Sequence, residues 1–333
     1  MPDLVSLGDI RAAAHRLNNV IVRTPLVPVP RLASPEVLNL LVKPESLQPT
    51  GAFKLRGAYN AIAALPADRR ASGVVAHSSG NHGFAVAYAA RKLGVKAAIV
   101  VPRGAPAVKT AAIESVGAEL VLVEPTLEAR VSASAHIAQT RGYAEVPPFD
   151  HRDVIAGQGT IGLEIADDLA AKGTAPAAVL VPVSGGGLIS GIAAAVKALS
   201  PDTKVIGVEP ELAADARESL HTGARVAWDA KDVARTMADA LRVEQVGVLP
   251  FAHMRELVSD IVTVTEDEIV DTIKRLALQA RLVAEPGGAV AVAAALFRTA
   301  SELGVAKDGE RPIVAVLSGG NIDPALLGTI LTT

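Results

Sequence analysis

Short apolar runs alternate along the chain with longer stretches in which apolar positions recur at helical spacing. The short runs are rich in Val, Ile, Leu and Ala, which is typical of strands buried on both faces of a parallel sheet. They predict strands at Leu38–Val42, Gly73–His77, Lys96–Val101, Ala118–Val123, Ala177–Val183, Lys204–Val208, Asp260–Val264 and Ile313–Leu317. The amphipathic stretches predict helices at Leu55–Leu65, Asn81–Leu93, Pro106–Ser115, Leu127–Thr140, Ile155–Ala171, Leu188–Ala198 and Glu266–Ala280. This alternation predicts an α/β fold.

Three of the predicted strands end in a cluster of serine and glycine that leads into the next segment. These clusters are His77–His82 (HSSGNH), Val183–Leu188 (VSGGGL) and Leu317–Asn321 (LSGGN). In open α/β sheets, ligands bind beyond the carboxyl ends of the strands. We therefore expect the three loops to line one crevice.

Composition narrows the class of protein. The chain has 333 residues, of which 50% are hydrophobic and 20% are charged, so it can bury a core. The net charge of −3 and the lack of basic blocks argue against nucleic acid as a partner. No apolar run has the length of a membrane span, and the N-terminus does not resemble a signal peptide. The absence of cysteine excludes disulfides and thiolate sites and suits the cytoplasm.

The glycine cluster after Val183 is the strongest chemical signal in the chain. Adjacent glycines at a helix start let backbone N–H groups converge on an anion, so Ser184–Leu188 predicts a phosphate cradle. The alternative is a tight turn from strand to helix. Gly185 and Gly187 also match two positions of a dinucleotide fingerprint, and Glu209 ends the next strand. A nicotinamide-dependent oxidoreductase therefore remains an alternative at this point.

Two further features could serve a small anionic ligand. Residues Ser78–Gly83 (SSGNHG) offer hydroxyl, amide and N–H groups suited to a carboxylate, although an ordinary helix cap is an equal reading. Lys54 follows an aromatic residue in PTGAFK and opens an apolar helix, where desolvation would lower the pKa of its amine. Together with a phosphate loop, such a lysine indicates Schiff-base chemistry.

In combination these motifs resemble a known family. KPESLQPTGAFKLRGA (Lys43–Ala58), SSGNHG, PFDHRDVIAGQGT, SGGGL and LSGGN occur in the order found in the threonine dehydratase/serine racemase family of pyridoxal-phosphate (PLP) enzymes. The resemblance extends from about Thr24 to Asp323. It implies fold type II, in which two open, twisted, mainly parallel sheets flanked by helices hold PLP in the cleft between a large and a small domain.

The resemblance also implies roles for individual residues. Lys54 would bind PLP covalently and act as catalytic base, while Phe53 and Glu285 would lie beside the cofactor. Asn81 would donate a hydrogen bond to the 3′-oxygen of PLP, and Ser318 would face its ring nitrogen. The phosphate would be held by Ser184, Gly185, Gly186, Gly187 and Leu188. The substrate carboxylate would be held by Ser78, Ser79, Gly80, Asn81 and His82.

Ser318 bears on the type of reaction. A hydroxyl cannot stabilise a protonated ring nitrogen as a carboxylate can, so the ring is a weaker electron sink and prompt loss of a β-substituent is favoured. The resemblance therefore implies dehydration and deamination of a β-hydroxy amino acid, L-threonine or L-serine. Alternatives are an amino-acid racemase, with Ser79 as the second acid/base, and a dehydratase of a specialised substrate. That substrate could be 3-hydroxyaspartate, with Arg130 facing its second carboxylate, or a hydroxyectoine-pathway intermediate. A non-catalytic binding protein is a further alternative.

The resemblance adds a metal site and a domain layout. Glu209, the carbonyl group of Ala213 and Asp215 match a site for Mg²⁺ or Ca²⁺, and oxygen ligands suit such hard cations. The large domain would comprise residues 1–72 and 148–333, and residues 73–147 would form a small mobile domain that carries SSGNHG. We expect a homodimer and no C-terminal regulatory domain. Ala52, Phe84 and Ala240 depart from the usual family residues and leave the preferred side chain of the substrate open.

Overall fold

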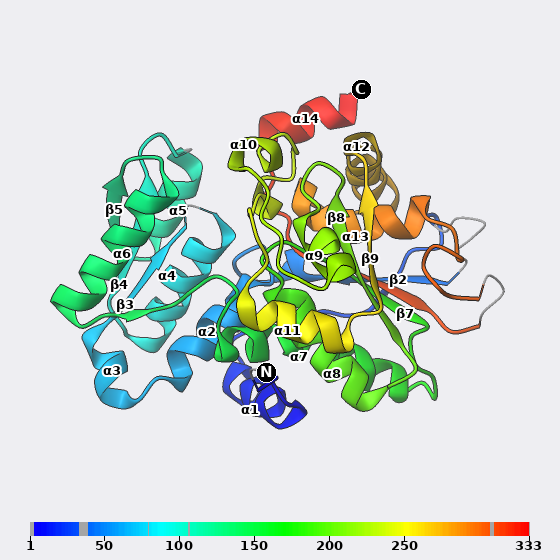
Figure 1. The fold of residues 1–333 in the computed structure, drawn as a ribbon, viewed down its shortest axis with the longest axis horizontal. Helices are drawn as coiled ribbons and strands as arrows, with labels where there is room; N and C mark the ends of the chain where they lie inside the picture. Colours follow the sequence, from blue (N-terminus) through cyan, green and yellow to red (C-terminus); the bar gives the residue numbers. More distant parts are fainter. Residues whose placement is uncertain (1–2, 33–38, 79, 106, 307–309, 333) are drawn as a thin grey trace.

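The computed structural model describes residues 3–32, 39–78, 80–105, 107–306 and 310–332 (Figure 1). The strands are β1 (Val27–Pro28), β2 (Leu40–Pro44), β3 (Val74–His77), β4 (Ala97–Pro102), β5 (Glu119–Val123), β6 (Ala144–Glu145), β7 (Ala178–Pro182), β8 (Lys204–Pro210), β9 (Asp260–Val264) and β10 (Ile313–Leu317). All eight predicted strands are confirmed, with shifts of one or two residues at their ends. Leu38, the predicted start of the first strand, lies outside the described residues.

The described helices are α1 (Leu7–Leu17), α2 (Lys54–Ala64), α3 (Ala67–Ser72), α4 (Asn81–Leu93), α5 (Ala107–Ser115), α6 (Leu127–Arg141), α7 (Arg152–Ala170), α8 (Gly187–Leu199), α9 (Asp215–Thr222), α10 (Ala230–Val233), α11 (Val248–Leu257), α12 (Glu266–Arg275), α13 (Pro286–Phe297) and α14 (Pro324–Thr332). The seven predicted helices are confirmed as α2, α4, α5, α6, α7, α8 and α12, and the other described helices were not predicted. Short turns of 3-10 helix lie at Glu45–Leu47 and Asp239–Leu241. Pro106, the predicted start of α5, lies outside the described residues.

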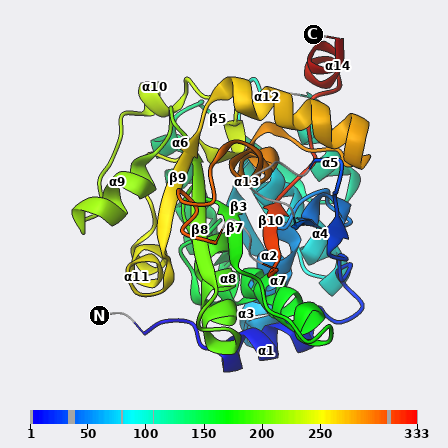
Figure 2. The same ribbon diagram turned by 90° about the vertical axis from the view of Figure 1, so that its right-hand side faces the viewer.

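The larger sheet has six strands in the order β1-β2-β10-β7-β8-β9. Only the β1–β2 pair is antiparallel among the described pairs of this sheet. Alternate residues of one strand face opposite layers: Ala178 and Leu180 of β7 join the core beneath α13, whereas Val179 and Val181 join the core beneath α8. Burial on both faces explains why these strands are continuous apolar runs. Figure 2 shows α1 and α14 at opposite ends of this unit.

The smaller sheet is fully parallel, in the order β5-β4-β3-β6. Helices α2 and α4 share one core with β3 and β4, while α6 covers the other face. Figure 1 shows this sheet beside the larger one, with α2 between them. The prediction of two mainly parallel sheets flanked by helices is confirmed. The two-residue strands β1 and β6 were not predicted, because segments so short carry no periodic signal.

One predicted helix ends early. The stretch Glu266–Ala280 is α-helical only to Arg275, and Leu276–Ala280 form a π-helical turn. Arg281 then adopts a left-handed conformation with φ of 60°, which few residues other than glycine occupy. The chain is thereby turned toward Glu285, which caps α13.

A buried network of four charged side chains joins β2, α2 and α7. The Arg56 guanidinium contacts Glu45 (2.7 Å) and Glu164 (2.7 Å), and the Lys43 amine contacts Glu164 (2.6 Å). Arg56, Lys43 and Glu45 are completely buried. Burial alone would raise the pKa of Glu164, but Arg56 and Lys43 outweigh it and lower that pKa. Two cations balance two anions, so the network needs no further charge.

We expect Glu164→Gln to lower the free energy of unfolding by about 3 kcal/mol, because it leaves buried cations without their carboxylate. Glu119→Gln makes the same chemical change in the exposed ion pair with Arg141 and should cost less than about 1 kcal/mol. Chemical denaturation of both variants measures the difference. Equal losses would contradict a structural role for the network.

Candidate active site

The PTGAFK turn and the LSGGN loop lie side by side. Ala52 and Gly319 form an isolated antiparallel bridge. The Phe53 N–H donates to the Ser318 carbonyl group (3.0 Å), and the Gly320 N–H donates to the Gly51 carbonyl group (2.9 Å). Ser318 directly follows β10 and is buried, and its hydroxyl group lies 3.5 Å from the Gly287 carbonyl oxygen. The pairing therefore brings Phe53 and Ser318, which are distant in sequence, into one site.

Lys54 opens α2, and its amine has an uncharged hydrogen-bond partner. Nζ donates to the Pro148 carbonyl oxygen at 2.8 Å and lies 5.1 Å from the centre of the Phe53 ring. Burial lowers the pKa of Lys54 from its ordinary value of 10.5 to about 8. A neutral fraction near physiological pH is what a nucleophilic or basic amine requires.

The triple-glycine loop adjoins the residue that follows Pro148. A Cβ at Gly185 would lie 2.3 Å from the ring of Phe149, so the loop and this ring fit only because no side chain is present. Gly186 has φ of 87° and precedes α8, whose first N–H groups therefore face the loop. Ser184 Oγ is buried without a hydrogen-bond partner among the described residues. A buried orphan hydroxyl beside a helix start fits an anion such as a phosphate.

Asn81 opens α4 and contacts the LSGGN loop and the residue that precedes α13. Its Nδ2 donates to Glu285 Oε1 (2.6 Å), and its Oδ1 accepts from Asn321 Nδ2 (2.8 Å). Ser78 Oγ accepts from the Gly80 N–H at 3.2 Å. A Cβ at Gly80 would meet nothing within 4 Å, so the space beside this loop is open. Ser79 lies outside the described residues.

His82 has a structural contact that the sequence did not indicate. Nε2 lies 2.8 Å from the Val146 carbonyl oxygen and must carry the proton, because a carbonyl group only accepts. Burial, together with the nearby charge of Lys54, lowers the pKa of His82 to about 3. The imidazole therefore stays neutral and joins α4 to the segment after β6, which leaves only its backbone for a ligand.

Comparison with known proteins agrees with these features. The family model for pyridoxal-phosphate dependent enzymes matches residues 17–319. L-threonine ammonia-lyase of Thermotoga maritima is 41% identical over 328 residues, which cover 98% of this chain and 78% of that protein. L-threo-3-hydroxyaspartate ammonia-lyase of Saccharomyces cerevisiae is 37% identical over 325 residues, which cover 98% and 96%. The structure of maize serine racemase has a TM-score of 0.88 at 34% identity and covers 99% of this chain and 98% of that chain.

The chain belongs to the pyridoxal-phosphate dependent enzymes. This confirms the resemblance drawn from the motifs and the fold that it implied. The residues present also fit the cofactor: an amine of lowered pKa lies near a glycine loop with an unpartnered hydroxyl group, and a serine directly follows the strand beside it. The nicotinamide alternative fails at Glu209, which is buried and accepts the N–H groups of Ala216 (3.2 Å) and Arg217 (2.8 Å).

Two predicted site residues of this PLP-dependent enzyme, Arg130 and Asp215, lie on helices α6 and α9 rather than in the loops described above. Arg130 is on α6, where its Nε donates to the Thr126 carbonyl group at 3.3 Å. Its charge, after burial, contributes to the lowered pKa of His77, which ends β3 just before SSGNHG. Asp215 opens α9, and both of its carboxylate oxygens are buried without a hydrogen-bond partner in the described part of the chain. Burial raises the pKa of Asp215 to about 7, and burial and Asp215 raise that of Glu209.

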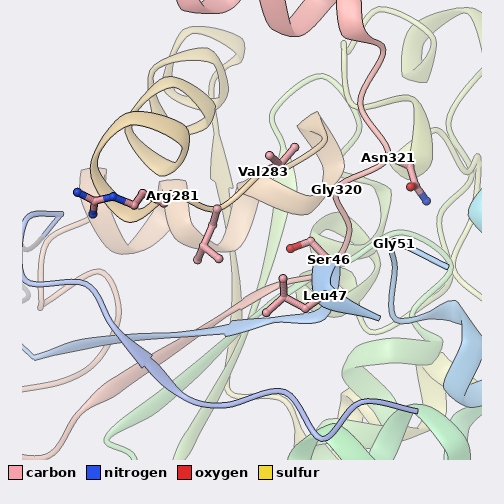
Figure 3. A pocket seen from close by; sticks show the side chains of 8 residues that line it. Ser46, Leu47, Gly51, Arg281, Val283, Gly320 and Asn321 are labelled. Atoms are coloured by element: carbon pink, nitrogen blue, oxygen red, sulfur yellow. The ribbon is translucent and has the colours of Figure 1, made fainter. Parts of the chain in front are cut away.

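A cavity of about 220 Å³ lies on the outer side of the paired loops. It is lined by Ser46, Leu47, Gly51, Arg281, Leu282, Val283, Gly320 and Asn321. Figure 3 shows Gly51 and Asn321 at one side and Arg281 at the other. Neither Lys54 nor the triple-glycine loop lines it. This cavity therefore borders the candidate active site but is not the active site itself.

Sequence reasoning missed three groups that hold the site together. The carbonyl groups of Pro148 and Val146 bind the side chains of Lys54 and His82, and a backbone acceptor leaves no mark in the sequence. Asn321 was noted only as the end of the LSGGN loop. An asparagine directly after two glycines was the available signal, since asparagine is favoured in turns, where its side-chain amide forms hydrogen bonds with backbone groups.

We expect the amine of Lys54 in the cofactor-free enzyme to react with an acylating reagent with a midpoint near pH 8, because burial lowers its pKa to about 8. The modified peptide can be quantified by mass spectrometry across the pH range. Lys54→Arg should remove that peptide. A midpoint near 10.5 would show that the site does not lower the pKa of this amine.

Proposed function

We propose that this enzyme removes ammonia from a β-hydroxy amino acid, converting L-threonine to 2-oxobutanoate or L-serine to pyruvate. The observation that carries the proposal is the amine of Lys54, which has a carbonyl group rather than a carboxylate as its partner and a pKa lowered to about 8. The water lost in the elimination is regained when the released enamine product hydrolyses, so the net products are the 2-oxo acid and ammonia.

Each loop has a part in this proposal. Bound PLP supplies an aldehyde that captures the amino group of the substrate and a ring that withdraws electrons from Cα. Ser184 to Leu188 would hold its phosphate, Phe53, Glu285 and Asn81 would lie beside it, and Ser318 would meet its ring nitrogen. The amine of Lys54 would take the proton from Cα of the substrate.

Ser318 and the SSGNHG loop decide the direction of the reaction. A serine hydroxyl would leave the ring nitrogen of bound PLP essentially unprotonated, and the weaker electron sink would favour loss of the β-hydroxyl group. The N–H groups of Ser78, Ser79, Gly80, Asn81 and His82 orient the substrate carboxylate at the start of α4. The open space beside Gly80 supports this assignment.

The assembly in this proposal follows the division of the sheets. Residues 73–147 form a small domain that closes over the substrate and excludes water, and residues 1–72 with 148–333 form the large domain. The enzyme works as a homodimer in the cytoplasm. Support comes from the four-stranded sheet, whose strands span residues 74–145, and from the composition, which lacks cysteine.

We expect purified enzyme loaded with PLP to release 2-oxo acid from L-threonine or L-serine, and Lys54→Ala to lower kcat at least about 1,000-fold because the base and the covalent anchor are lost. A panel of β-hydroxy amino acids, assayed for 2-oxo acid and for the D-isomer together, measures this.

The same panel separates the alternatives. Net formation of D-serine without 2-oxo acid would identify a racemase and overturn the proposal. Faster turnover of 3-hydroxyaspartate than of threonine would instead assign the acidic substrate. The charge of Arg130 near His77, and the 3-hydroxyaspartate ammonia-lyase of yeast among the relatives, favour that substrate as the second candidate.

Asp215, Glu209 and the Ala213 carbonyl group also fit a divalent cation. Glu209 and Asp215 are two buried carboxyl groups that repel each other when charged, and no basic side chain compensates Asp215 among the described residues. Bound Mg²⁺ or Ca²⁺, with water completing its shell, would neutralise both. The site lies at the start of α9, and the bound cation would have a structural or activating role.

We expect Ca²⁺ to raise the melting temperature of the enzyme, and more so at pH 8 than at pH 6. Burial raises the pKa of Asp215 to about 7, so its carboxyl group is deprotonated and free to bind only above that pH. Asp215→Asn should abolish the response, whereas Glu211→Gln, on an exposed neighbour, should retain it. An unchanged response in Asp215→Asn would exclude the site.

A further inference from the structure

Asn321 contacts two groups of the site directly and a third through Asn81. Its Nδ2 donates to the Thr50 carbonyl oxygen at 2.9 Å and to Asn81 Oδ1 at 2.8 Å. Asn81 Nδ2 in turn donates to Glu285 Oε1 at 2.6 Å. The chain of contacts therefore runs from the PTGAFK turn through LSGGN and SSGNHG to the start of α13.

The donors and acceptors of this chain allow only one orientation of each amide. Both hydrogens of Asn321 Nδ2 face acceptors, so a flipped Asn321 would set its oxygen against two other oxygens. Asn81 must then present its oxygen to Asn321 and its nitrogen to Glu285. A flipped Asn81 would set two NH₂ groups against each other and its oxygen against a carboxylate. Asn321 and Glu285 thus together fix the orientation in which the Asn81 amide donates.

Gly51 makes room for this arrangement. It has φ of 71°, and a Cβ there would lie 2.2 Å from Asn321 Oδ1. Figure 3 shows Asn321 beside Gly51 at the edge of the cavity. The PTG turn therefore leaves space for the amide of Asn321 and also leads the chain into Lys54.

The contact also crosses between the sheets. Asn81 opens α4, which packs on the four-stranded sheet, whereas Thr50, Glu285 and Asn321 belong to the loops of the six-stranded sheet. Asn81 Nδ2 has two hydrogens, and Glu285 takes one of them. The second hydrogen, held in the same plane, is the donor available to a ligand.

We propose that Asn321 is a positioning residue: the orientation that it imposes on the Asn81 amide sets the donor that Asn81 offers to the 3′-oxygen of bound PLP. This rests on the proposed place of Asn81 beside the cofactor. Asn321 touches neither the substrate nor the reacting atoms in this scheme. It acts through Asn81 alone.

Asn321→Ala and Asn321→Asp test the proposal. Aspartate fills the same space but presents only oxygen, so it cannot donate to Asn81 Oδ1 and opposes that oxygen instead, which displaces the Asn81 amide from the orientation that Asn321 supports. We expect the dissociation constant for PLP to rise about fivefold to tenfold in Asn321→Ala and at least as much in Asn321→Asp. The ratio of the two absorption bands of bound PLP, which reports whether its 3′-oxygen carries a proton, should change in both.

The controls separate positioning from folding. Asn39→Ala and Asn39→Asp make the same changes at an exposed asparagine that donates to the Glu310 carbonyl group, and both should match the parent within about twofold. Asn321 is itself exposed, so the melting temperature of the cofactor-free variants should stay near that of the parent.

The outcomes can be told apart. Parental PLP affinity and band ratio in Asn321→Asp would overturn the proposal, because filling the space would then suffice. Melting of the cofactor-free variants well below the controls would make Asn321 a folding residue and would also overturn it. A parent protein without a PLP band sensitive to Lys54→Ala would refute the site itself, a failure visible before any Asn321 variant is compared.

Discussion

The fold is organised around a buried guanidinium. Arg56 lies two residues after Lys54 on α2 and meets Glu45 and Glu164 in an environment closed to water. A buried cation is costly unless it is paired, so β2, α2 and α7 must come together in one arrangement for the chain to fold. Lys43 completes the balance of charge through Glu164. The position of the helix that begins at Lys54 is thereby fixed by electrostatics as well as by apolar packing.

Arg56 and Lys54 lie on the same helix, but Arg56 has a structural role and Lys54 a chemical one. Arg56 has two carboxylate partners, and its pKa is raised. Lys54 has the carbonyl group of Pro148, and burial lowers its pKa to about 8. The pKa values of these two cations on one helix thus shift in opposite directions, because only Arg56 has carboxylates beside it. This difference makes Lys54 the reactive amine.

The segment between the two sheets carries much of the site. Val146 binds His82, Pro148 binds Lys54, and Phe149 packs against Gly185. A change in the angle between the sheets would therefore displace the SSGNHG loop, the amine of Lys54 and the triple-glycine loop together. The contacts of Asn81 with Glu285 and Asn321 form a second link across the same boundary.

The sequence by itself determined the eight longer described strands, most of the longer helices and the motifs, because these follow from local periodicity and from residue types with narrow chemical uses. Three glycines after a buried strand predict an anion site wherever that strand lies. The motifs in order also identified the family. Tertiary structure alone decided the partners: that Lys54 meets a carbonyl group, that His82 is neutral and tied to Val146, and that Asn321 orients Asn81. Such contacts join residues up to 240 positions apart, often through backbone groups that every residue possesses, so no local pattern can reveal them.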